Sequence, residues 1–365
     1  MPRFPEKNGG SELSRILSLR LLLFLCFFPL LLLSCATIPT TQPTAGWLAV
    51  LPPLTPDSLY ASVDVASSWS LLETLAEAGG NGTEQLERII GKLDRVHARI
   101  RFSPEASTGP EFHMIAVGSF PTGPVTRRLN RDPSWQRIVL EPPSGRGNYG
   151  SRWSYRTYWR KGEFQIAVPE PGLLLLTGAV QAQGEPAGSG PADPDGAAGA
   201  EALLRLLHAP RAQSLPSEAR GVSESADIFF YIPDPAVLAL SAASSTRTAQ
   251  PAQDPGALLQ NLPIRQGWIS ARQLTSPEGE EGYQLEVVFL LAGVEKPRSV
   301  EMLLRLILTL WLRKSQVEDP VQTLKTATFR TDTESARIES LFLKTGEIVS
   351  FFETLLPEDL GAGLP

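Results

Sequence analysis

Alternating basic and aromatic side chains in the segment 152–160 form the part of this chain best suited to bind a ligand. The segment reads Arg-Trp-Ser-Tyr-Arg-Thr-Tyr-Trp-Arg. On a β-strand, successive side chains point to opposite faces, so the two Trp share one face and the three Arg share the other. A row of guanidinium groups beside aromatic rings is suited to an anionic partner.

The basic charge extends well beyond this segment. From Arg127 to Lys161 there are eight Arg and one Lys against one Asp and one Glu, a net charge of +7. A region of this charge is suited to an anionic envelope component, such as lipid headgroups or an acidic glycan, or to an acidic protein surface. The candidate binding residues are Arg152, Arg156, Arg160, Trp153, Trp159, Arg127 and Arg128.

The same strand has a purely structural alternative, which we favour. Its aromatic side chains would lie in the core and its Arg side chains in solvent, as is ordinary on an exposed sheet face. His97, Arg99 and Arg101 share the polar face of a second strand, 96–102. They would extend the basic surface if the two strands were neighbours.

No motif in the sequence names a reaction. The chain has three His, without HxxxH spacing, so we expect surface or half-buried histidines and no metal site. Lys344-Thr345-Gly346 resembles the Lys-Thr-Gly triad of penicillin-binding proteins and serine β-lactamases, but no Ser-x-x-Lys nucleophile motif accompanies it. We therefore expect no catalytic residue and no cofactor.

The apolar run Leu21–Leu33 indicates in which compartment the rest of the chain lies. A net-positive segment precedes the run, which spans 13 residues and is interrupted by Pro29. A helix needs about 20 apolar residues to cross a bilayer, so this pattern is typical of a signal peptide. The run ends in Leu32-Leu33-Ser34-Cys35, which resembles the lipobox of bacterial lipoproteins.

That resemblance implies cleavage before Cys35 and a lipid, with palmitate among its acyl chains, on the new N-terminal cysteine. Ala36 follows, where inner-membrane lipoproteins of many Gram-negative bacteria carry Asp, so the resemblance favours the outer membrane. The mature domain would be periplasmic or surface-exposed. An uncleaved signal anchor over 16–33 is the alternative.

Composition limits the function of the mature chain. The net charge is −6 for the whole chain and becomes −8 once the leader is removed, so we expect no nucleic-acid partner. Cys26 would leave with the leader, and Cys35 would be the only remaining cysteine. We therefore expect no disulfide.

Sequence patterns predict an α+β protein with two tandem related units joined by a disordered linker. Each unit is expected to be an antiparallel sheet with helices on one face, similar to a split βαβ unit. The alternative is one continuous sheet shared by both halves. We predict a signal peptide at 1–34, a lipidated Cys and Pro/Thr-rich spacer at 35–57, units at 58–180 and 226–358, a low-complexity linker with one short helix at 181–225, and a tail at 359–365.

Periodicity predicts the individual elements. In 59–65 apolar residues alternate with polar ones, as in a half-buried strand. The strongest helix is expected over Pro297–Lys314, where a broad apolar stripe favours burial against the sheet over contact with a partner or a membrane.

The sequence favours a non-enzymatic, lipid-anchored envelope protein with a binding or scaffolding role. One alternative is a carrier or assembly factor that holds lipid or an apolar segment near the basic strand. Another is an envelope-polymer hydrolase whose site is built from distant loops. The sequence does not determine the oligomeric state.

Overall fold

The computed structural model describes residues 46–78, 91–102, 108–140, 157–181, 199–208, 215–235, 258–259, 262–276 and 279–355. The leader, Cys35 and the tail lie outside these ranges, as do Arg152, Trp153 and Arg156. The spacer is described from Gly46 onward, and the linker at 181, 199–208 and 215–225.

The described residues form an α+β fold around one antiparallel sheet of 12 strands. The strands are β1 (Ser58–Asp64), β2 (Leu93–Arg101), β3 (Thr108–Gly118), β4 (Gln136–Val139), β5 (Thr157–Lys161), β6 (Phe164–Glu170), β7 (Leu173–Gln181), β8 (Ile228–Ile232), β9 (Ile264–Thr275), β10 (Glu281–Leu291), β11 (Thr328–Thr331) and β12 (Ser335–Lys344). The helices are α2 (Trp47–Val50), α3 (Trp69–Ala78), α5 (Thr122–Arg131), α6 (Ala200–His208), α7 (Ser217–Ser225), α10 (Pro297–Lys314), α11 (Pro320–Thr326) and α12 (Thr345–Leu355).

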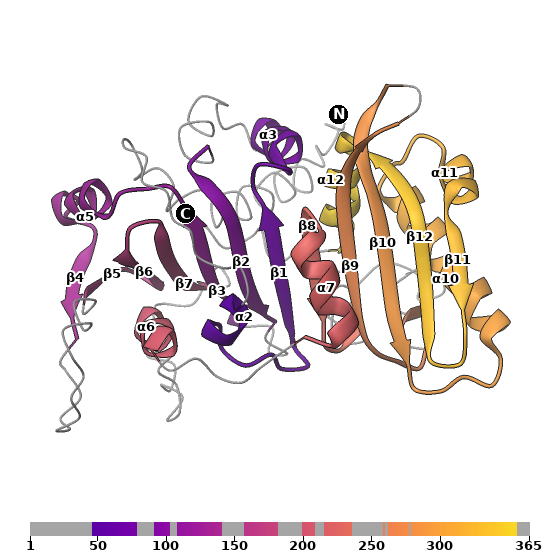
Figure 1. The fold of residues 1–365 in the computed structure, drawn as a ribbon, viewed down its shortest axis with the longest axis horizontal. Helices are drawn as coiled ribbons and strands as arrows, with labels where there is room; N and C mark the ends of the chain where they lie inside the picture. The colour runs from indigo at the N-terminus through magenta and orange to yellow at the C-terminus, as the bar shows by residue number, and fades with distance from the viewer. Residues whose placement is uncertain are drawn as a thin grey trace, which may run out of the picture.

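Both halves of the chain share this sheet, whose strand order is β11-β12-β10-β9-β8-β1-β2-β3-β7-β6-β5-β4 (Figure 1). The first strands of the two halves, β1 and β8, pair at its centre, with Tyr60 opposite Tyr231. A separate sheet for each unit is therefore wrong, and the continuous sheet is observed. The physical reason is that β1 and β8 would otherwise each expose an edge of unpaired backbone groups.

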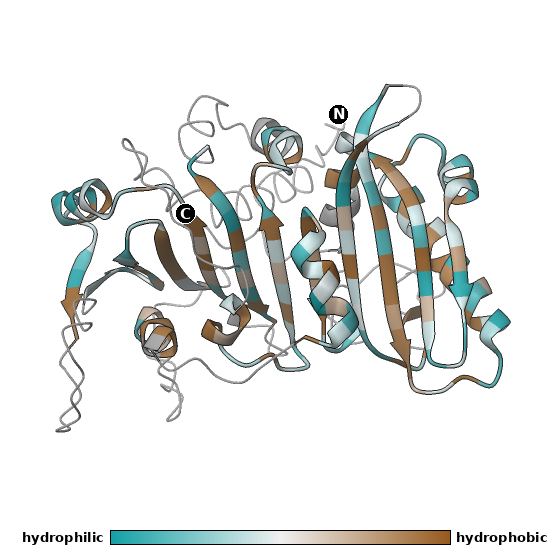
Figure 2. Cartoon of the chain, in the orientation of Figure 1, coloured by the Kyte–Doolittle hydropathy of each residue, from teal (hydrophilic) through white to brown (hydrophobic). Residues whose placement is uncertain are grey.

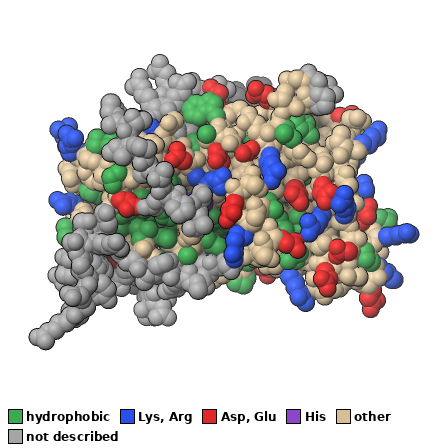
Figure 3. Space-filling model, viewed as in Figure 1, with side chains coloured by type: hydrophobic (Ala, Val, Ile, Leu, Met, Phe, Trp, Pro, Cys, Tyr) green, Lys and Arg blue, Asp and Glu red, His purple; other side chains and the backbone are tan. Residues whose placement is uncertain are grey.

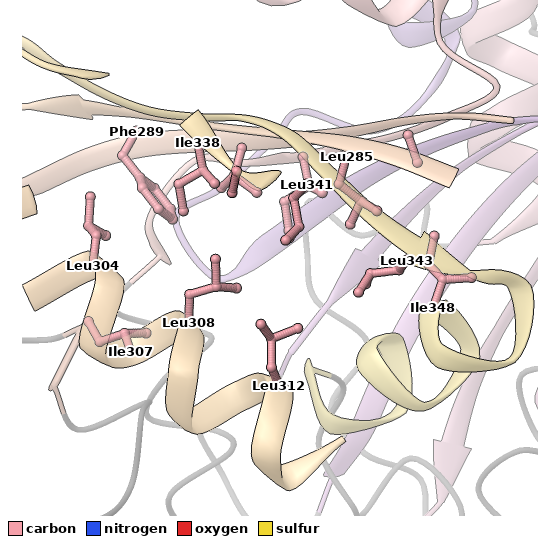
Figure 4. Close-up of a cluster of buried hydrophobic side chains, with 14 of the residues drawn as sticks. Leu285, Phe289, Leu304, Ile307, Leu308, Leu312, Ile338, Leu341, Leu343 and Ile348 are labelled. Carbon is pink, nitrogen blue, oxygen red and sulfur yellow. The ribbon is translucent and has the colours of Figure 1, made fainter. Parts of the chain in front are cut away.

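One face of the sheet carries α3, α5, α10 and α12. Leu304, Ile307, Leu308 and Leu312 of α10 pack toward apolar side chains of β10 and β12, and Ile348 of α12 completes the cluster (Figure 4). The predicted helix over 297–314 is confirmed with the same bounds. Its burial is confirmed along that stripe, although Met302 on the opposite side is exposed.

The other face carries α2, α6 and α7. Their apolar residues cluster with Ile115, Leu175, Phe229 and Trp268 of the sheet. Inside the predicted units 58–180 and 226–358, helices α3, α5, α10 and α12 lie on the first face, as expected, whereas α2, α6 and α7 belong to the predicted spacer and linker. These segments pack on the second face because strands such as β3 and β7 contribute buried apolar residues to both clusters; the hydropathy of the strands is coloured in Figure 2. Trp47 and Leu51 belong to this cluster, so the end of the predicted spacer is docked on the body.

Helix α7 was not expected from the sequence. Its segment reads Ser-Glu-Ala-Arg-Gly-Val-Ser-Glu-Ser and contributes only Ala219 to the fully buried core. Arg95 of β2 compensates for this poor pattern by donating to the Ser223 and Ala226 carbonyls at the end of the helix, at 3.2 and 3.4 Å. A cation at a helix C-terminus also interacts favourably with the helix dipole.

Arg95 joins the two halves of the chain beside the β1–β8 pair. Its Nη2 lies 3.2 Å from Asp64 Oδ2, and its side chain is only 12% exposed. The Asp64 amide in turn donates to the Asp227 carbonyl in the second half. Partial burial opposes ionisation of Asp64, but the Ser67 amide and Arg95 lower its pKa overall. One cation therefore satisfies a carboxylate and two helix-terminal carbonyls.

Replacing Arg95 with Met should destabilise the fold by about 2–4 kcal/mol, because Asp64 and two carbonyls lose their donor while the side-chain length is kept. Urea unfolding followed by circular dichroism measures the change.

Arg330→Met is the matched control, since Arg330 makes a surface ion pair with Glu339 at 3.4 Å and is 71% exposed. That variant should change the free energy of unfolding by no more than about 1 kcal/mol. Equal effects of the two substitutions would show that Arg95 does not join the halves as described.

Candidate functional site

The predicted basic strand is described only in part. Trp159 is 3% exposed in the core, and its Nε1 donates to Asn130 Oδ1 at 3.0 Å. Arg160 is exposed on the opposite face of β5, and its Nε donates to the Gly162 carbonyl at 3.1 Å. This arrangement matches the structural role for these two residues. Arg127 and Arg128 are exposed on α5, and the remaining candidates lie outside the described residues.

His97 and Arg99 do not extend that surface. Their strand, β2, is separated from β5 by β3, β7 and β6. Both side chains lie on the face covered by α2, α6 and α7, and they are 4% and 5% exposed. The expectation of surface or half-buried histidines is therefore wrong for His97 and for His113, which is 3% exposed.

A row of polar side chains instead crosses the covered face of the first half. Strand register places Tyr60 opposite Arg99, Arg99 opposite His113, His113 opposite Thr177, and Thr177 opposite Gln165. Directly opposed residues in an antiparallel sheet have their Cβ atoms about 5 Å apart. We call these five residues the buried polar row.

The two outer members of the buried polar row are hydrogen-bonded. The Tyr60 hydroxyl lies 2.9 Å from His97 Nδ1. Gln165 Oε1 accepts from the Ala200 amide at 3.0 Å, at the start of α6. The row is thus hydrogen-bonded to His97 at one end and to the start of α6 at the other.

The three inner members each keep an unpaired polar atom. Arg99 Nε, His113 Nδ1 and Thr177 Oγ1 have no hydrogen-bond partner among the described residues. Buried polar groups normally find a partner in the protein, in ordered water or in a ligand, since leaving one unpaired costs about 1–3 kcal/mol. Three such atoms on adjacent strands therefore identify the row as the candidate site.

Two acidic residues, Asp57 and Glu111, lie close to the cations Arg99 and Arg101. Arg99 Nη2 donates to Thr55 Oγ1 at 3.2 Å. Arg101 Nε lies 2.9 Å from Asp57 Oδ2, and His113 Nε2 lies 3.6 Å from Glu111 Oε1. Burial lowers the pKa of Arg99, while Glu111 and Asp57 act in the opposite direction. The charges of the two Arg and the two acids cancel.

Both histidines are neutral near pH 7. Burial, with a smaller contribution from Arg95, lowers the pKa of His97 to about 3. Burial, with a smaller contribution from Arg99, lowers the pKa of His113 to about 3. The ring of His97 also stacks beside Trp47 and Tyr60, at centroid distances of 6.5 and 6.3 Å. Neutral imidazoles can hydrogen-bond a ligand but supply no positive charge.

Sequence reasoning did not select His113 or Thr177. The signal that could have found them is the apolar runs around them, Phe-His-Met-Ile-Ala-Val and Leu-Leu-Leu-Leu-Thr-Gly. Runs without alternation are typical of strands buried on both faces, and a polar residue within such a run is necessarily buried. Among the described residues, no group of His, Cys, Asp and Glu is arranged to hold a metal ion.

The exposed surface beyond this site is mixed in charge. Acidic and basic side chains are interspersed over the part of the molecule that contains β9–β12 (Figure 3). Within the described ranges, no helix combines the length and the hydropathy required to cross a bilayer.

Comparisons with known proteins show the fold and not the function. No protein-family model and no curated protein matches the sequence. Two similar solved structures are crystal forms I and IV of TP0453, each at 13% identity and a TM-score of 0.51. The alignments cover 85% and 87% of this chain and 97% of that chain in both cases. TP0453 therefore shares the overall fold.

The two buried histidines should make the protein sensitive to acid. Their folded-state pKa values of about 3 lie below the ordinary value of 6.5, so between these limits the unfolded chain binds more protons. The contribution of each His to the free energy of unfolding is therefore fully present above pH 6.5. Between pH 6.5 and 3 it decreases by about 1.4 kcal/mol for each pH unit by which the pH is lowered. Urea unfolding at several pH values between 7 and 4 measures the slope.

His113→Gln should remove its share of that slope while leaving the contribution of the carboxylates unchanged. The comparison uses the change of stability with pH, so a constant loss from the substitution itself does not affect it. A variant with the same pH slope as the wild type would contradict the neutral, buried state of His113.

Proposed function

We propose that this chain is a non-enzymatic, lipid-anchored protein of the cell envelope with a binding or scaffolding role. The observation that carries the proposal is the sequence Leu21–Cys35, a short apolar run that ends in a lipobox-like tetrapeptide. In the proposal the lipid on Cys35 holds the body at the membrane, the outer membrane in preference to the inner one. The body itself faces the periplasm or the surface.

The short distance in sequence between Cys35 and the body supports this arrangement. The body begins at α2, whose Trp47 and Val50 are buried. Ten residues separate Cys35 from Gly46, and the eleven steps between these two residues span at most about 36–40 Å when the chain is fully extended. A lipid at Cys35 would therefore keep α2 within this distance of the bilayer surface.

We also propose that the body arose from two related units. Each half starts with a central strand, continues outward through two further strands, and then returns from the edge of the sheet to pair with the third. The returning segment contains α5 and the outer strands β4, β5 and β6 in the first half, and α10, α11 and the outer strand β11 in the second. Thus β7 pairs with β3 in the first half, and β12 pairs with β10 in the second. The shared order supports duplication, with the two units joined in one sheet rather than separated.

Cys35→Ala should abolish metabolic labelling with palmitate and shift the protein from the membrane to the soluble fraction. Labelling and fractionation of cells that express each form measure both properties. The physical reason is that the proposed anchor is a thioether-linked lipid, which Ala cannot carry.

Cys26→Ala is the matched control, because Cys26 lies within the proposed leader. This variant should be labelled and retained like the wild type. Unaltered labelling and membrane retention of Cys35→Ala would disprove the lipid anchor.

Replacing Arg152, Arg156 and Arg160 together by Ser should weaken binding to an anionic partner if the basic strand forms a contact surface. The expected loss is about tenfold at low salt and smaller at high salt, because exposed charges are screened. Flotation with vesicles that contain anionic lipid measures the binding.

The matched control replaces Arg298, Arg313 and Arg330, three exposed Arg of the second half, by Ser. It removes the same charge at a different place. Equal binding by both triple variants would assign any attraction to net charge and exclude a site on the basic strand.

A further inference from the structure

We propose that the inner members of the buried polar row, Arg99, His113 and Thr177, bind a small neutral ligand rich in hydroxyl groups, of the size of a monosaccharide or disaccharide. The inference goes beyond the proposed envelope role, because it assigns a ligand class to residues that the lipid anchor does not involve.

The first argument is the burial of the unpaired atoms. Arg99, His113 and Thr177 are 5%, 3% and 2% exposed, and each keeps a polar atom without a partner among the described residues. Their neighbours along the row, Tyr60 and Gln165, are hydrogen-bonded. Within the buried polar row, the unpaired atoms therefore lie on three adjacent strands, β2, β3 and β7, although other buried polar atoms among the described residues, such as His97 Nε2 and Trp268 Nε1, also lack a partner.

The second argument is the distance that the three strands span. Neighbouring strands lie about 4.8 Å apart, so the backbones of β2 and β7 are separated by about 10 Å. A single water molecule reaches partners only about 3 Å away. A ligand that satisfies all three side chains therefore needs several polar atoms in a row, as a sugar has.

The third argument is the pattern of donors and acceptors. Arg99 Nε carries a hydrogen and can only donate, whereas the Thr177 hydroxyl can donate and accept. Glu111 Oε1 faces His113 Nε2 at 3.6 Å. We assign the proton of the neutral ring to Nε2 on this basis, which leaves Nδ1 as an acceptor. Hydroxyl and amide groups, which both donate and accept, can satisfy all three atoms, as can separate water molecules, and the titration below distinguishes a bound sugar from water.

The fourth argument is charge. Arg99 and Arg101 are balanced by Asp57 and Glu111, and His113 is neutral near pH 7. A buried anion would add an unpaired charge to this balanced group and would need a further cation. The row therefore favours a neutral ligand over a phosphate or a carboxylate.

The helices on this face of the sheet contribute apolar side chains and one aromatic ring, Trp47, which lies beside His97. Trp47 and Leu51 at α2, and Leu203 and Leu206 of α6, belong to the same apolar cluster as Ile115 and Leu175. Aromatic faces beside polar groups suit the alternating apolar and hydroxyl surfaces of a sugar ring. Helix α2 has only four residues, so its displacement would break few backbone hydrogen bonds on ligand entry.

The test is a titration of the lipidated full chain, purified in detergent and labelled with ¹⁵N-histidine, with glucose, trehalose or inorganic phosphate. The His113 signals are assigned with His113→Gln. Glucose or trehalose should shift the His113 Nδ1 resonance saturably, with a dissociation constant below about 10 mM. Phosphate should cause no saturable shift.

Thr177→Val, which keeps the shape of the side chain, should weaken sugar binding about tenfold, the equivalent of one hydrogen bond. Thr74→Val is the matched control, because Thr74 lies in α3 on the other face and its hydroxyl donates to the Ser70 carbonyl in its own helix at 2.8 Å. It should bind as the wild type does.

Saturation by phosphate alone would contradict the neutral ligand class. If neither sugar saturates the signal, the row holds only water and the proposal is wrong. Equal sugar affinity of Thr177→Val and the wild type would place the ligand elsewhere. None of these outcomes bears on lipid attachment, which the Cys35→Ala labelling tests separately.

Discussion

The pairing of β1 with β8 is the interaction on which the rest of the structure depends. It joins strands that begin the two halves of the chain and turns two sets of strands into one sheet. Arg95 stabilises the join from one side by binding Asp64 of the first half and the end of α7 in the second. Most of these groups are shielded from water, so each needs a hydrogen-bond partner within the protein. Because the partners come from both halves, these bonds fix the position of one half relative to the other.

Burial of both faces is the second constraint. A sheet covered on one side only can direct its polar residues to solvent, whereas here helices lie on both sides. Polar residues of β2, β3 and β7 are consequently enclosed, and each must be bonded to the protein or to another molecule. The buried polar row is the result, and it combines one neutral histidine, His113, with a charge-balanced Arg.

The molecule thus has two chemically different regions in its first half. Arg127, Arg128 and Arg160 are exposed and suited to weak, salt-dependent contacts. The buried polar row is enclosed and suited to specific hydrogen bonds in a region of low dielectric constant. A lipid anchor would set the distance of both regions from a membrane. Both regions fit the binding role proposed above.

The sequence by itself determined the individual elements wherever one side of an element is apolar. It predicted α10 with its observed bounds, the strands at 59–65 and 96–102 to within about three residues of β1 and β2, and the burial of Trp159. It did not reveal α7, whose nine residues are largely polar, because the contacts that stabilise the helix come from residues distant in the chain, among them Arg95, Arg272 and Arg337. Only the tertiary structure decided that the halves share one sheet, that His97 and Arg99 are buried, and that His113 and Thr177 are neighbours. The physical reason is that periodicity reports which side of a strand is apolar, whereas strand pairing and the cover over the second face depend on residues distant in the chain.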